Sequence, residues 1–307
     1  TEFMALENGY HGESAAALGV SHLGIYRDQY AALLPDVRFI NGVPYVCGRG
    51  DPLWADCGEA WGFIEAQLEE REKNLAGIIL EPVLQGAGGM RLYSAAFLRK
   101  IRKWTKAHDV YLIADEIMTG FGRTGYDLAC KHAEIAPDFI CLSKGLTAGW
   151  LPFSCVLTST DTYQLFYDDY EKGKSFLHSN TYCGNALAAA VALETLRVYD
   201  DEDIYARVRQ NQEHLLACMK EAADRTGRLK NVRGIGAVAA ADLDLSGDVK
   251  DRRMGYRVFQ EAVKLGALLR PLGNTLYWFP PLNTDRTVIE DLKEITIKAI
   301  NTTTGVV

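Results

Sequence analysis

The 307-residue sequence lacks several features that would assign it to a specialised class of protein. Its apolar runs, such as residues 75–80, fall far short of the roughly 20 residues that a membrane helix requires. It has no basic run and a net charge of −7, so we expect neither a nucleic-acid partner nor a membrane partner. No signal-peptide pattern opens it, and we expect a cytoplasmic protein.

Cysteine and histidine occur in small numbers and in no metal-binding or redox pattern. The seven cysteines include no CxxC pair, and we interpret them as small buried side chains in a reducing compartment. The six histidines form no HxxxH or HxH pair, so the sequence predicts no metal site. No GxSxG motif is present either, which leaves a Ser-His-Asp hydrolase without support.

What remains is the composition of a globular protein, with 48% apolar and 24% charged residues over a length that suggests roughly two domains. Four short apolar runs, at residues 76–80, 110–114, 139–142 and 153–157, are continuous rather than alternating. Such runs are typical of strands covered on both faces, and they indicate a parallel sheet.

A helix is predicted between the first two strands. Ser94 is a suitable N-cap, and the following residues form one apolar stripe at helical spacing: Phe97, Leu98, Ile101 and Trp104. Strand, helix and strand together form a βαβ unit. The expected fold is therefore α/β with a mostly parallel sheet.

The C-terminal part has a different pattern. Good helix formers from residue 186 to about 224, interrupted by acidic residues at 200–203, predict a pair of connecting helices. Beyond them the sequence predicts, in order, a strand near 237–241, a helix near 253–264, a hairpin at Gly273-Asn274 and a final helix from about 287. We therefore expect a large domain over residues 1–205 and a smaller α+β domain over residues 206–307.

Polar residues follow the predicted strands where each strand ends: Glu81, then Asp115, then Lys144. The carboxyl ends of parallel strands lie along one edge of a sheet, so Asp115 and Lys144 should face one crevice. Partial desolvation lowers the pKa of a lysine and makes it a usable nucleophile toward carbonyls. The alternative is a surface lysine in a βα loop and an Asp115 that only caps a helix.

This lysine and acid are the pair that pyridoxal phosphate requires. The cofactor is held by a lysine at one end, and an aspartate at the other end keeps the ring nitrogen protonated. Asp115 precedes Lys144 by 29 residues, which allows the two side chains to meet opposite ends of a planar ring.

Three further features have competing interpretations. Residues 120–125, GFGRTG, match GxGxxG, but they do not open a long helix, so a dinucleotide site is weakly supported. The glycines of QGAGGM at 85–90 could bind a phosphate or simply form turns. Arg270, next to Pro271, could bind a substrate carboxylate or be an ordinary surface arginine.

Taken together, the segments EPVLQGAGGM (81–90), LIADEIMTGFGRTG (112–125), PDFICLSKGLTAG (137–149) and FLHSNTYCGNALAAA (176–190) resemble the class III aminotransferases of the fold type I pyridoxal-phosphate enzymes. The resemblance covers almost the whole chain. Segments 9–14, 130–138 and 269–281 are most similar to the members that aminate 8-amino-7-oxononanoate in biotin biosynthesis. Another ω-aminotransferase of this class, or a non-catalytic truncated fragment, is the alternative.

The resemblance implies a role for individual residues around the cofactor. Lys144 matches the lysine that binds the cofactor covalently, and Asp115 matches the partner of the ring nitrogen. Tyr10 and Ile117 match the residues on the two ring faces, and Gln85 matches a contact near the phenolic oxygen.

The resemblance also implies contacts outside the ring. Thr181 matches a residue that reaches the phosphate in the neighbouring subunit, so a homodimer with shared sites is expected. Arg270 matches the arginine that receives the carboxylate of the small-molecule keto substrate, and Arg123 lies at a family position near the active site.

Two departures from the family pattern, and a larger gap before the GYHG motif, affect these expectations. Glu13 stands where an Asp is familiar in the best-known members. His178-Ser179-Asn180 replaces a Gly-Pro pattern before Thr181, which leaves S-adenosylmethionine and lysine both open as amino donors. Family members also carry roughly a hundred residues before the GYHG motif, including a Gly/Ser loop that binds the cofactor phosphate at a helix N-terminus. We therefore expect this chain to lack part of the phosphate site.

Overall fold

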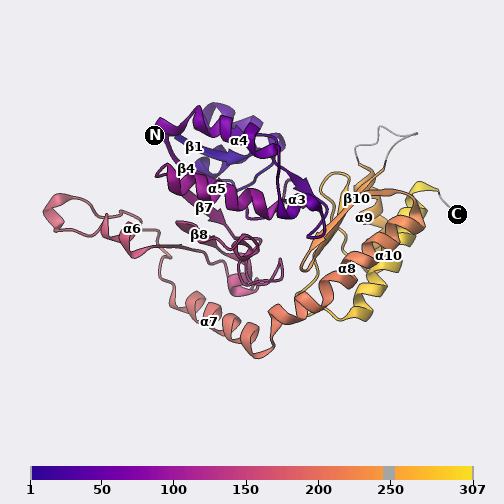
Figure 1. The fold of residues 1–307 in the computed structure, drawn as a ribbon. Helices are drawn as coiled ribbons and strands as arrows, with labels where there is room; N and C mark the ends of the chain where they lie inside the picture. Colours follow the sequence, from indigo (N-terminus) through magenta and orange to yellow (C-terminus); the bar gives the residue numbers. More distant parts are fainter. Residues whose placement is uncertain (1, 245–252, 306–307) are drawn as a thin grey trace.

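The computed structural model describes residues 2–244 and 253–305, and its larger part is built around a six-stranded sheet (Figure 1). In spatial order the strands are β2 (Arg38–Ile40), β1 (Glu2–Leu6), β4 (Leu75–Leu80), β7 (Tyr111–Asp115), β8 (Phe139–Leu142) and β9 (Cys155–Thr158). The pairs from β2 to β8 are parallel, and β9 runs antiparallel to β8. The predicted α/β fold with a mostly parallel sheet is confirmed.

The expectation that all four apolar runs form parallel strands is wrong for β9. A parallel connection requires a crossover, usually an α-helix. The residues between β8 and β9 instead form a one-turn 3-10 helix, η4 (Lys144–Thr147), and a short loop. Without a crossover helix the chain turns back, and Leu142 pairs with Cys155.

The helix between β4 and β7 forms as predicted. It is α5 (Ala95–Ala107), and the Ser94 hydroxyl accepts a hydrogen bond from the Phe97 N–H at 3.2 Å. Its apolar stripe is buried, consisting of Phe97, Leu98, Ile101 and Trp104. The cap and the stripe together explain why this segment is a helix packed on the sheet.

Shorter elements complete the N-terminal part. The helices are α1 (Ala15–Gly19), α2 (Gly24–Arg27), α3 (Pro52–Ala55), α4 (Ala60–Glu69) and α6 (Thr160–Gln164). The remaining 3-10 helices are η1 (Asp28–Leu33), η2 (Glu72–Asn74), η3 (Ala129–Ala133) and η5 (Tyr170–Lys172). A small antiparallel sheet has the order β3 (Tyr45–Val46), β6 (Arg91–Tyr93) and β5 (Leu84–Gln85). The segment around α6 projects from the body as an arm (Figure 1).

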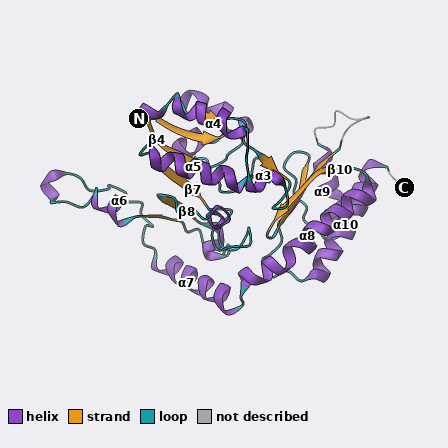
Figure 2. Ribbon diagram, in the orientation of Figure 1, coloured by secondary structure: helices purple, strands orange, loops and turns teal. Residues whose placement is uncertain are grey.

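The C-terminal elements agree with the predicted order. They are α7 (Ala186–Asp201), α8 (Ile204–Thr226), β10 (Leu229–Ile235), β11 (Val238–Leu243), α9 (Met254–Lys264), β12 (Thr275–Trp278) and α10 (Arg286–Thr304). Leu272 and Thr275 exchange backbone hydrogen bonds across Gly273-Asn274, so the chain turns tightly there. The predicted hairpin is reduced to this isolated bridge, because β12 pairs with β11 instead. Figure 2 shows the antiparallel strands beside α9 and α10, apart from the strands of the large sheet.

The chain has two main apolar cores among the described residues. One surrounds the large sheet and includes the fully buried Ile78, Leu80 and Leu112. The other lies between α8, α10 and β11–β12 and includes the fully buried Trp278. The boundary at 205/206 stays a prediction, and it falls in the first turn of α8.

The interpretation of all seven cysteines as buried is wrong. Cys47 and Cys183 are exposed because they lie in loops, and Cys141 and Cys155 are only partly buried. All seven are free thiols. Over the described ranges, no helix is both long enough and apolar enough to cross a membrane.

Candidate active site

The carboxyl edge of the large sheet brings Asp115 and Lys144 to neighbouring strand ends. Asp115 is the last residue of β7 and pairs with Cys141 of the parallel strand β8. Lys144 begins η4, two residues after β8 ends, with a backbone φ of +42°. That left-handed conformation is uncommon for a residue with a side chain, and it turns the chain sharply at the sheet edge.

Lys144 lines a cavity of about 560 Å³. Two other predicted residues line it as well, namely Ile117 and Arg123. Its lining also includes the end of α7 and four residues of the C-terminal part, Phe279, Pro281, Leu282 and Asn283. The structure therefore brings three of the eight predicted site residues into one cavity.

Asp115 is held in place by a histidine that the sequence analysis did not identify. His11 Nδ1 lies 2.7 Å from Asp115 Oδ2, and the exposed fractions of the two side chains are 1% and 7%. The second oxygen, Oδ1, accepts a hydrogen bond from the backbone N–H of Ile117. Among the described residues His11 Nε2 is buried without a hydrogen-bond partner. A histidine directly after Tyr10 in GYHG was the available signal.

Tyr10 is positioned by two glutamates. Its backbone N–H donates to Glu81 Oε1 at 3.1 Å, and its hydroxyl donates to Glu13 Oε1 at 3.1 Å. Burial, together with Glu13, raises the pKa of the Tyr10 hydroxyl. Burial also raises the pKa of Glu81 to about 7, although this carboxyl accepts N–H groups from both Tyr10 and Gly86.

Arg123 is held by the C-terminal part of the chain. Its Nη1 donates to the carbonyls of Ala237 and Pro280, at 3.0 and 2.8 Å, and its guanidinium lies 3.6 Å from the ring centre of Phe279. Burial lowers its pKa to about 10. Gly236, at φ +56°, lies so close to the Arg123 carbonyl that a Cβ would overlap it. The GFGRTG loop thus joins the two parts of the molecule rather than opening a dinucleotide-binding helix.

Gln85 is buried, and both ends of its side-chain amide form hydrogen bonds within the chain. Its amide nitrogen donates to the Glu7 carbonyl at 2.7 Å, and its oxygen accepts from the Tyr45 hydroxyl at 2.9 Å. Thr181 and Arg270 are exposed, and neither lines the cavity that holds Lys144. These three residues, together with Asp115 and Tyr10, are not among the residues that line the Lys144 cavity. Asp115 lies at the neighbouring strand end instead of on the wall of this cavity.

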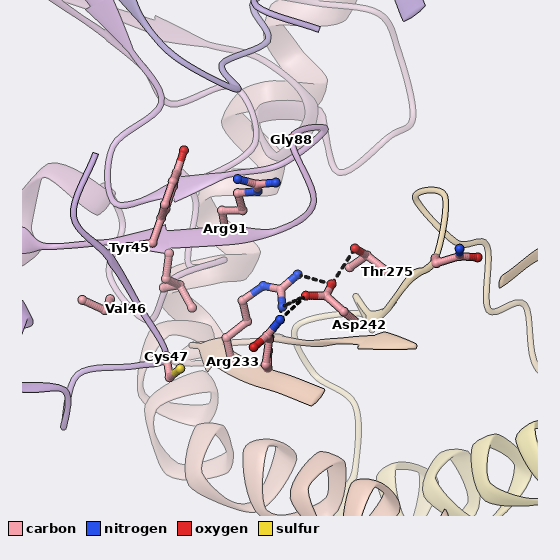
Figure 3. A pocket seen from close by; sticks show the side chains of 11 residues that line it. Tyr45, Val46, Cys47, Gly88, Arg91, Arg233, Asp242 and Thr275 are labelled. Atoms are coloured by element: carbon pink, nitrogen blue, oxygen red, sulfur yellow. Dashed lines mark hydrogen bonds and ion pairs between the residues drawn. The ribbon is translucent and has the colours of Figure 1, made fainter. Parts of the chain in front are cut away.

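A second hollow lies between β3, β6 and the C-terminal sheet (Figure 3). Its central feature is Arg233, whose guanidinium pairs with both oxygens of Asp242. Arg233 also donates to the carbonyls of Gly89 and Met90, so the QGAGGM loop serves as a packing contact. The phosphate interpretation of these glycines gains no support, because the loop's neighbours are side chains and carbonyls of the protein.

The family model for class-III aminotransferases matches residues 1–300. The chain belongs to the class-III aminotransferase family. Members of this aminotransferase family are pyridoxal-phosphate enzymes, and the family agrees with the α/β fold described above.

Several similar proteins share one name, adenosylmethionine-8-amino-7-oxononanoate aminotransferase. The Helicobacter pylori protein is 35% identical over 91% of this chain, which spans 62% of that protein's length. The Geobacter sulfurreducens protein is 34% identical over 99% of this chain and 69% of its own. A solved structure of that name from Methanocaldococcus jannaschii has a TM-score of 0.88 at 27% identity, covering 98% of this chain and 68% of its own.

Proposed function

We propose that the protein containing this chain is a pyridoxal-phosphate-dependent aminotransferase of biotin biosynthesis. In this proposal it converts 8-amino-7-oxononanoate to 7,8-diaminononanoate, with S-adenosylmethionine as the amino donor. The observation that carries the proposal is the placement of Asp115 and Lys144 at adjacent strand ends in a class-III aminotransferase chain. The proposed substrate is supported by seven similar proteins, 30–35% identical to this chain, that are named adenosylmethionine-8-amino-7-oxononanoate aminotransferase.

The described residues fit the ring of pyridoxal phosphate. Asp115 offers a buried carboxylate, already oriented by His11 and by the Ile117 N–H, that can accept a hydrogen bond from a protonated ring nitrogen. Lys144 offers an amine on the wall of the same cavity as Ile117. The unpartnered Nε2 of His11 marks a buried polar position beside this carboxylate.

When bound, the cofactor withdraws electrons from the carbon that carries the amino group. In the proposed mechanism Asp115 would accept a hydrogen bond from the protonated ring nitrogen, and His11 would hold the Asp115 carboxylate in line. Lys144 is the residue that would hold the cofactor covalently, and when it is free its Nζ would move the proton at the reacting carbon.

The remaining proposed contacts follow the family pattern. Tyr10 and Ile117 would cover the two ring faces, Gln85 would lie near the phenolic oxygen, and Thr181 would reach the phosphate in the neighbouring subunit. In a second group, Arg270 would bind the substrate carboxylate bidentately, and Arg123 would shape the wall of the cavity. These roles stay proposals.

We also infer a cytoplasmic homodimer. The arm around α6 exposes large apolar side chains, including Tyr170 at 89% and Leu177 at 93%. Apolar surface of this extent is typical of an interface, and a second copy would bury it beside Thr181. Analytical ultracentrifugation should therefore detect a dimer. The seven free cysteines suit a reducing compartment.

A second function has specific support. A putrescine–pyruvate aminotransferase from Pseudomonas aeruginosa is 31% identical over 98% of this chain. The test supplies the purified protein with pyridoxal phosphate and compares two reactions: 8-amino-7-oxononanoate with S-adenosylmethionine or lysine, and pyruvate with putrescine.

We expect the higher kcat/KM with 8-amino-7-oxononanoate and S-adenosylmethionine. A higher value with putrescine and pyruvate would replace the proposed substrate but keep the aminotransferase. No turnover in either reaction, with no cofactor retained, would favour a non-catalytic fragment.

A further inference from the structure

A cluster of three potential metal ligands lies on the C-terminal helices, outside the aminotransferase site. His214 and Cys218 are one turn apart on α8, and Glu290 faces them from α10, which packs against α8 (Figure 1). Cys218 is buried, whereas the side chains of His214 and Glu290 are 24% and 45% exposed. An ion could therefore reach the three ligand atoms from solvent.

The spacing of the ligand atoms matches one face of a zinc tetrahedron. His214 Nε2 lies 3.2 Å from Glu290 Oε1, Cys218 Sγ lies 3.5 Å from that oxygen, and Sγ lies 3.7 Å from Nε2. Tetrahedral Zn²⁺ with ordinary bond lengths places N and O about 3.3 Å apart, S and O about 3.5 Å apart, and S and N about 3.6 Å apart. The three atoms need almost no movement to share one ion.

The neighbouring charges hold Glu290 in the orientation that this geometry requires. Lys293 Nζ lies 2.6 Å from Glu290 Oε2, which leaves Oε1 facing His214 and Cys218. Lys293 is buried and also pairs with Glu221 at 2.9 Å, so its charge remains balanced when Glu290 binds a cation. Outer contacts of this kind are what orient ligands in metal sites.

We propose that His214, Cys218 and Glu290 bind a Zn²⁺ ion, with water as the fourth ligand. An imidazole, a thiolate and a carboxylate form a donor set that suits zinc. Binding forms one bond each to Nε2, Sγ and Oε1, and the thiol proton that now points to Glu290 is released to solvent. The ion would tie α8 to α10 and so stabilise the C-terminal part.

Neither the absence of histidine pairs nor the absence of CxxC excludes this site. Glu290 lies 72 residues after Cys218, and only the packing of α8 against α10 brings them together. The local signal was the H-x-x-x-C spacing on one helix face.

The test titrates purified, tag-free protein containing the full chain with Zn²⁺ by calorimetry, and with Co²⁺ by absorption spectroscopy. We expect one Zn²⁺ per chain, a thiolate-to-cobalt absorption band, and a Tm that rises with Zn²⁺. Cys218→Ser should remove the band, and both Cys218→Ser and His214→Gln should weaken Zn²⁺ binding at least about tenfold. Cys47→Ser, at an exposed thiol elsewhere, is the control and should bind like the parent.

His214→Gln alters a partly exposed side chain, so it keeps the test valid if Cys218→Ser folds poorly. Failure of the parent to bind one Zn²⁺, or equal Zn²⁺ affinity in the parent and in His214→Gln, would overturn the proposal. A cobalt band that persists in folded Cys218→Ser would do the same. None of these results depends on transaminase activity.

Discussion

The orientation of the Asp115 carboxylate depends on its contact with His11 more than on the position of Asp115 at the end of β7. The Asp115 side chain is only 7% exposed, so its oxygens need protein hydrogen-bond partners in place of water, and His11 Nδ1 lies 2.7 Å from Oδ2. The strand end positions the backbone, and the histidine then orients the carboxylate. We therefore treat His11 as a positioning residue for the proposed site.

His11→Ala should lower kcat/KM for transamination about tenfold to a hundredfold, because a hydrogen bond to a charged group contributes about 1.5–3 kcal/mol. His11→Asn should restore part of the activity, since an amide N–H can replace Nδ1. Steady-state kinetics and cofactor titration measure both. If alanine and asparagine behave alike, the hydrogen bond to Asp115 is not what matters.

The raised pKa of Glu81 predicts that the free energy of unfolding depends on pH. The unfolded chain loses this proton near 4.5 and the folded chain near 7, so between these values the folded state binds more protons and rising pH favours unfolding. The full cost, present above about pH 7, is about 3 kcal/mol. Relative to the parent, Glu81→Gln should gain up to about that much free energy of unfolding between pH 4.5 and 8.

Urea unfolding at several pH values measures this difference. Glu69→Gln, on an exposed part of α4, is the matched control and should follow the parent. A constant difference between Glu81→Gln and the parent across the pH range would contradict the raised pKa.

Among the elements, α5 was the most predictable because its cap and its stripe agree. Ser94 is fully buried, and its hydroxyl satisfies the Phe97 N–H. Ser94→Ala should cost about 1 kcal/mol of unfolding free energy. Ser159→Ala removes the equivalent cap of the short, exposed α6 and should cost less. Equal losses in denaturant unfolding would show that burial of the cap is unimportant.

Other elements could not be predicted from local pattern. β2 has only three residues, too few to show a period, and β10 contains a bulge between Lys230 and Arg233 that breaks its alternation. β9 runs antiparallel because η4 at Lys144 and a short loop connect it to β8 without a crossover helix. The hydrophobicity of a strand does not indicate the direction in which it runs. Likewise the sequence indicated Asp115 and Lys144 from their places after apolar runs. The GYHG motif contains His11, but the contact with Asp115 spans 104 residues, so the motif alone does not predict which residue His11 contacts.

At the scale of the whole molecule, Arg233 on β10 connects the C-terminal part to the N-terminal part by hydrogen bonds to the 85–90 loop. It is buried, pairs with Asp242, and donates to carbonyls of the 85–90 loop. Arg233→Met should cost about 3–5 kcal/mol, because it removes the ion pair with Asp242 and leaves the carbonyls of Gly89, Met90 and Asn231 without this donor. Arg225→Met, at an exposed ion pair, should cost no more than about 1 kcal/mol. Similar unfolding free energies for the two variants would contradict the proposed tie.

The central claim is that Lys144 is the residue that binds pyridoxal phosphate for transamination. The most direct test is the visible absorption band retained after the protein is incubated with pyridoxal phosphate and desalted, measured together with turnover. The parent and Lys103→Ala, an exposed lysine on α5, should retain the band and the activity. Lys144→Ala should lose both while its circular dichroism stays unchanged. A Lys144→Ala protein that keeps the band and turns over at the parent rate would contradict the account.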